Sequence, residues 1–165
     1  MRSRQATVTQ YDFVGEPRGE VLDHLISAAI DACDRFTVEL SGMLLDDRAM
    51  QVLRAFEPFL MSCVETSETP GSILAPGDTI KLCTYRLNAA SAAVIRASAR
   101  RLYDWVEPSL PQCLCFLRGS EPWLINLAAD AEGCLLLSPE EAAAVRAAVP
   151  GLRIRQPRSR DISER

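Results

Sequence analysis

Residues 113–137 read CLCFLRGSEPWLINLAADAEGCLLL, and this stretch decides the fold. It holds three short apolar segments, 113–118, 123–128 and 134–137, which are typical of β-strands. The connections between them are only about four residues long and contain Gly, Pro, Asp and Ser, so neighbouring strands must run in opposite directions. The stretch therefore predicts an antiparallel meander.

Upstream of the meander the predicted strands are rich in β-branched and aromatic residues, and they span 7–14, 35–40, 59–66 and 79–87. The last of them, TIKLCTYRL, shows the clearest alternation of side chains. The predicted helices carry one apolar stripe each, and they span 18–33, 46–58, 88–106 and 138–149. Three of them begin at a good capping residue: Asp46 or Asp47, Asn88, and Ser138, which forms a capping box with Glu141.

This order of elements predicts an α+β fold, with a mixed or antiparallel sheet of six to seven strands covered by three to four helices. A length of 165 residues is typical of one domain, which we expect to span residues 1–152. Residues 153–165 hold five arginines and few apolar residues. We expect them to form a flexible tail, because they offer little to bury.

Composition narrows the function classes. Apolar residues make up 48% of the chain and charged residues 24%, which is typical of a globular protein. The net charge is −4, so a nucleic acid is an unlikely partner, because phosphate binding needs clustered Lys and Arg. The sequence shows neither a secretory leader nor an apolar run long enough to span a membrane, and we expect a cytoplasmic protein.

The sequence shows no catalytic, metal or cofactor motif. His24 is the one histidine, and it has no visible nucleophile beside it. The paired carboxylates at 46–47 and 140–141 lie at predicted helix starts, where the helix dipole favours negative charge. The six cysteines lie among apolar neighbours, and we expect all of them to be buried thiols. They are Cys33, Cys63, Cys83, Cys113, Cys115 and Cys134.

The most distinctive residues are aromatic. Tyr103, Asp104 and Trp105 lie at the predicted end of the third helix, and Trp123 opens a predicted strand. Trp and Tyr are enriched in binding hot spots, although large aromatics at the ends of elements more often belong to the core. We take Tyr103, Asp104, Trp105 and Trp123 as the candidate interaction surface.

The runs LYDW at 102–105, LCFLR at 114–118 and PWL at 122–124 resemble a pattern in small uncharacterised bacterial proteins. Small acidic proteins of this kind loosely resemble the immunity partners of bacterial polymorphic toxins. The resemblance implies a non-catalytic protein that binds and neutralises a basic toxin.

Two alternatives stay open at this point. One is a regulatory domain that binds a small molecule in a pocket near Trp105 and Trp123. The other is a thiol-dependent enzyme or redox protein that uses Cys113, Cys115 or Cys134. Self-association is a further expectation, because an exposed strand at the edge of a sheet must be covered, charged or paired.

Overall fold

The computed structural model describes residues 7–158 and shows one antiparallel sheet of eight strands with four α-helices. The strands are β1 (Thr9–Phe13), β2 (Arg35–Leu40), β3 (Leu60–Thr66), β4 (Ile80–Arg86), β5 (Gln112–Arg118), β6 (Glu121–Leu127), β7 (Glu132–Leu137) and β8 (Ile154–Arg155). The helices are α1 (Glu20–Ala32), α2 (Asp47–Phe56), α3 (Ala89–Ser98) and α4 (Pro139–Ala148), with short 3-10 turns η1 (Glu57–Phe59), η2 (Leu102–Asp104) and η3 (Ala128–Asp130).

The strand order is β3-β4-β2-β5-β6-β7-β1-β8, and every neighbouring pair is antiparallel. The α+β class and the meander of β5, β6 and β7 are therefore confirmed. The prediction of six to seven strands is wrong by one, because Ile154 of β8 pairs with Phe13 of β1. The expected tail at 153–165 is corrected at its start for the same reason, and residues 159–165 lie outside the described part of the chain.

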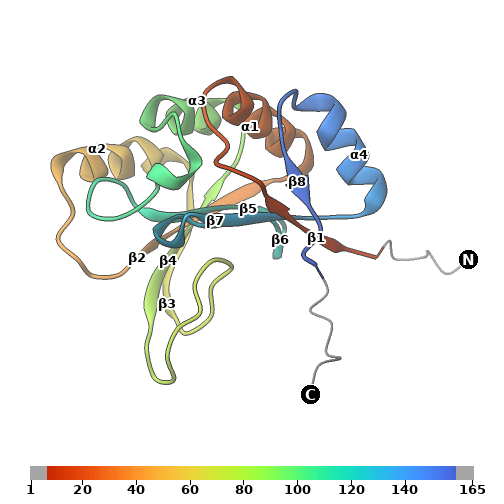
Figure 1. Cartoon of the computed structure of the whole chain (residues 1–165). Coiled ribbons are helices and arrows are strands. Elements are labelled where there is room, and N and C mark those ends of the chain that lie inside the picture. Colours follow the sequence, from red (N-terminus) through yellow and green to blue (C-terminus); the bar gives the residue numbers. More distant parts are fainter. Residues whose placement is uncertain (1–6, 159–165) are drawn as a thin grey trace, which may run out of the picture.

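The four helices cover one face of the sheet (Figure 1). The core lies between these two layers, and it includes an aromatic cluster of Phe36, Phe56, Tyr85 and Trp105. Phe36 and Tyr85 lie on paired strands and stack with ring centroids 5.1 Å apart. Such pairs add to the area that they bury, so this cluster joins α2 firmly to β2 and β4. None of the helices in residues 7–158 is long and apolar enough to cross a membrane.

The expected helix starts are confirmed. Asp46, Asn88 and Ser138 each accept a hydrogen bond from a backbone N–H three residues later. The third helix, however, ends at Ser98 and not near residue 106. Beyond it the chain turns back toward α1, where the Leu102 N–H donates to the Pro17 carbonyl at 3.0 Å. This tertiary contact buries Leu102, and helical spacing in the sequence cannot reveal it.

The other face of the sheet is covered in part by the connection between β3 and β4, residues 67–79. In Figure 1 this connection folds below the sheet, on the side away from the helices. Its Gly71 is buried against Glu39 of β2 and Cys113 of β5. A Cβ atom at position 71 would lie 2.8 Å from the Glu39 Oε2 atom and 3.1 Å from the Cys113 Cβ atom, so a larger residue there would require these side chains to shift.

Candidate binding surface

The structure buries the two tryptophans of the predicted interaction surface. Trp105 and Trp123 are each 1% exposed, and Trp105 stacks on Phe56 in the core. Trp123 lies elsewhere, beneath a shallow hollow of about 230 Å³ between α1 and α4. Their indoles offer a partner almost no surface, so the interpretation of these two residues as binding residues is corrected to a role in the core.

Tyr103 and Asp104 remain half-buried. The Tyr103 backbone N–H donates to the Glu16 Oε1 atom at 3.1 Å, and burial raises the pKa of its phenol to about 12. A contact between these two residues and a partner stays a prediction.

A β-bulge accounts for the position of Trp123. Phe116 of β5 pairs with Leu124 of β6, whereas the next residue, Leu117, pairs with Pro122. Trp123 is therefore an extra residue in β6. The strand alternation is interrupted there, and Trp123 and Leu124 both pack into the core under the helices. In a regular strand, adjacent residues such as Trp123 and Leu124 point to opposite faces of the sheet, so the alternation of the sequence alone does not predict that both are buried.

The cysteines at 113, 115 and 134 are buried thiols, as expected. Burial raises the pKa of Cys113 to about 12 and that of Cys134 to about 11, and it raises the pKa of Cys115 as well. Because the thiolate is the nucleophile, these three groups are poorly suited to thiol catalysis near neutral pH. The structure therefore lends the thiol-enzyme alternative no support at these positions.

Cys63 and Cys83 correct the expectation that every cysteine is a buried thiol. The two residues face each other across β3 and β4 and form a disulfide. Cys63 is exposed, whereas Cys83 is 2% exposed and belongs to the core. The pairing depends on the register between two strands, so the spacing of cysteines in the sequence did not reveal it.

Glu39 is the most unusual polar residue of the described chain. It is 1% exposed, and neither carboxylate oxygen has a hydrogen-bond partner of good geometry among residues 7–158. Burial raises the pKa of this carboxyl, and the nearby side chains of Ser72, Cys113 and Thr69 reduce that rise. Burial disfavours the charged form of Glu39, whose carboxyl lies directly against Gly71 of the connection at 67–79.

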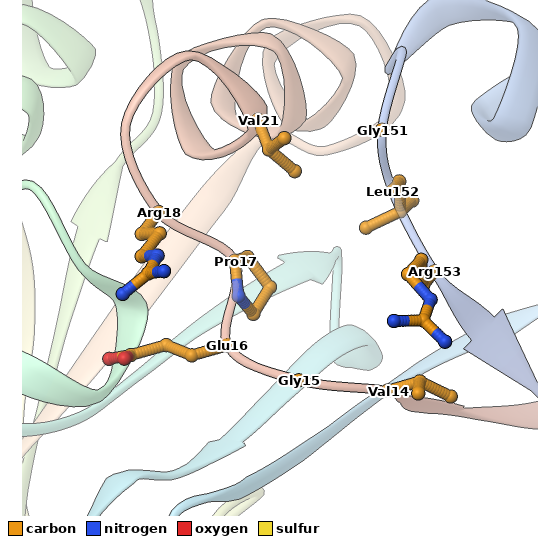
Figure 2. A pocket seen from close by; sticks show the side chains of 9 residues that line it. All are labelled: Val14, Gly15, Glu16, Pro17, Arg18, Val21, Gly151, Leu152 and Arg153. Atoms are coloured by element: carbon orange, nitrogen blue, oxygen red, sulfur yellow. The ribbon is translucent and has the colours of Figure 1, made fainter.

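An open hollow of about 480 Å³ lies between the β1–α1 connection and the segment before β8 (Figure 2). Figure 2 shows Val21 and Leu152 pointing toward each other across it, with Arg18 and Arg153 on opposite sides. Both arginines are exposed, and the Glu16 carboxylate is already bonded to Arg101 at 3.1 Å. The hollow thus contains no buried charge that a ligand must neutralise.

Exposed apolar side chains are concentrated in one part of the chain. Eight large apolar side chains of the described residues are exposed, and all but Val8 lie between residues 43 and 73. The seven are Met43, Leu44, Met50, Leu60, Met61, Val64 and Ile73. Gathered apolar exposure is a mark of protein interaction sites, whereas scattered apolar residues are ordinary. We call residues 43–73 the apolar segment.

The apolar segment contains β3, the strand at one edge of the sheet. Six of its seven residues are exposed, and within residues 7–158 it pairs with β4 only. The sequence correctly predicts a strand at 59–66, but it does not show that this strand lies at an edge. The charges of the sequence already set this region apart, because residues 55–80 contain four acidic residues and no Lys or Arg.

Comparison with known proteins gives no relative for this chain. No protein-family model, no curated protein and no solved structure matches it.

Proposed function

We propose that this protein is a non-catalytic protein-binding module, and that the apolar segment is its binding surface. The observation that carries the proposal is the concentration of seven exposed apolar side chains within residues 43–73. Three of them are methionines, whose flexible thioethers adapt well to a partner's surface. Burying these side chains against a partner removes apolar area from water, which is the main favourable term in most protein association.

The charge around the segment supports an immunity-type role toward a basic partner. Residues 55–80 alone carry the net charge of −4 that the whole chain has. The acidic residues there are Glu57, Glu65, Glu68 and Asp78, and all four are exposed. An acidic patch speeds association with a basic protein and disfavours acidic ones. A basic toxin such as a nuclease fits this surface.

A small-molecule-binding domain is the second candidate. The observation in its favour is the hollow of Figure 2, whose volume of about 480 Å³ lies within the usual range of ligand pockets. It lies away from the position expected for such a pocket, since it contains neither Trp105 nor Trp123. The hollow above Trp123 is smaller, at about 230 Å³.

Calorimetric titration of the purified protein with each product of the adjacent genes tests the first candidate. Leu44 is 91% exposed, so Leu44→Ser should leave the fold intact and weaken binding by roughly fivefold or more if Leu44 is a central contact. Val8→Ser is the matched control, because Val8 is 57% exposed and lies outside the apolar segment. Absence of binding to every product at micromolar concentration would overturn the proposal, and so would equal effects of the two variants.

A further inference from the structure

The outer edge of β3 presents backbone groups that β4 does not use. The Cα atoms of Cys63 and Cys83 lie 4.1 Å apart, which is the spacing of a non-hydrogen-bonded antiparallel pair. The N–H and C=O groups of Cys63 therefore point away from β4, and those of Glu65, two residues further, do the same. An extended chain can add to such an edge through main-chain hydrogen bonds.

The charges along this edge limit what can add to it. Residues 55–80 hold four acidic residues and no basic one; Glu65 lies on β3, and Glu57 lies in η1 just before it. β3 itself carries one acidic residue, Glu65, and no basic one, so a second copy paired β3 to β3 would bring only like charges from the two edge strands together, at a cost in repulsion. A partner strand with basic side chains has the complementary charge.

The two faces of the edge differ in chemistry. On the helix side, Glu65 continues a cross-strand row with Lys81 and Leu40, beside a hollow of about 280 Å³ that Met43 and Leu45 also line. A long basic side chain opposite Glu65 can reach its carboxylate and lay its aliphatic stem toward this hollow. On the other side, Val64 is 51% exposed and pairs with Leu82, so an apolar side chain fits there.

The geometry points to β3 as the docking edge for an extended segment of a partner protein in which basic and apolar side chains alternate. The segment joins the sheet as a ninth strand, with its basic side chains on the helix side near Glu65 and its apolar side chains beside Val64. This inference rests on the proposed protein-binding function and names the chemistry of the partner.

Fluorescence anisotropy with labelled seven-residue peptides tests it. The probe alternates arginine and valine, and two controls replace arginine by glutamate or carry N-methyl groups along one backbone edge. We expect the arginine peptide to bind, the glutamate peptide not to bind, and N-methylation to abolish binding. Glu65→Gln should weaken the arginine peptide roughly two- to fivefold, the range for one exposed ion pair. Glu65→Pro should abolish binding, because it also removes an outward N–H that β4 does not use.

Glu121→Gln is the matched control, since Glu121 is exposed and lies on β6. Equal binding of the arginine and glutamate peptides would overturn the inference, as would unchanged binding in Glu65→Pro. The arginine-rich end of another copy of this chain could also supply the basic strand, and a peptide of residues 153–165 and light scattering of the whole protein test this. Binding of the peptide together with chain-like assembly would show that the docked segment comes from another copy and not from a different protein. A protein partner that binds wild type and Glu65→Pro equally would sink the inference while leaving the proposed function standing.

Discussion

The two edges of the sheet differ in length, burial and charge. β8 has two residues, and its Ile154 is 9% exposed. Arg153 and Arg155 flank that side chain, and Pro157 follows. β3 has seven residues, three of which are exposed large apolar side chains, and it has neither proline nor a basic residue. Short length, basic side chains and proline are the usual ways in which proteins block an edge, so β8 is blocked and β3 is open.

The difference separates two uses of apolar residues at a sheet edge. At β8 the apolar side chain points into the core and contributes to folding. At β3 the apolar side chains remain in water, where they contribute little to the stability of the isolated chain. An open edge also invites aggregation, so retaining one suggests a use in binding.

The disulfide at the open edge provides the largest expected effect. Reduction of Cys63–Cys83 should lower the free energy of unfolding by about 3 kcal/mol, because it releases a loop with a sequence separation of 20 residues in the unfolded chain. Urea denaturation with and without reductant measures the change. A Cys63→Ala, Cys83→Ala double variant should not respond to the reductant. Six reactive thiols in the unfolded, unreduced protein would contradict the prediction.

Apolar truncation at the two edges sharpens the comparison directly. Ile154→Ala at β8 should destabilise the protein by about 2 kcal/mol, the lower end for a buried isoleucine. Val64→Ala at β3 should change stability by less than about 0.5 kcal/mol, as is usual for a surface substitution. Urea denaturation of both variants gives the two values. Similar losses would show that β3 contributes to folding as much as β8 does.

Glu39 lies in contact with the connection that leaves the open edge, and Glu39→Gln should have a smaller effect than Ile154→Ala. The pKa of Glu39 is raised in the folded protein, so its contribution is most favourable below the unfolded pKa of about 4.3 and is lost as pH rises through the folded pKa. Glu39→Gln removes the cost of ionising a buried carboxyl without a hydrogen-bond partner. It should raise the free energy of unfolding by about 1 kcal/mol at pH 8 and by less at pH 5.

Urea denaturation at the two pH values, with Glu121→Gln as control, measures this effect. The lowered pKa values of Asp34 and Glu141 act in the opposite direction, since their contributions are lost as pH falls. The difference between Glu39→Gln and wild type isolates the Glu39 contribution from theirs. If Glu39→Gln raised the free energy of unfolding equally at pH 5 and pH 8, the result would contradict this prediction.

The sequence by itself determined the elements that depend on neighbouring residues. Alternation over 79–87, short turns in 113–137 and caps at Asp46, Asn88 and Ser138 were enough to predict the strands, the meander and the helix starts. These features involve contacts over a few residues, so their pattern is written in the local sequence.

Only the tertiary structure decided which of these side chains are buried and which are exposed. The tryptophans are buried because a bulge in β6 turns Trp123 toward the core and a fold of the chain stacks Trp105 on Phe56. Glu39 is buried because a distant connection closes over it, and β3 is exposed because no described strand lies beyond it. Strand order, bulges and coverage all arise from contacts between residues far apart in the chain, which local periodicity does not encode.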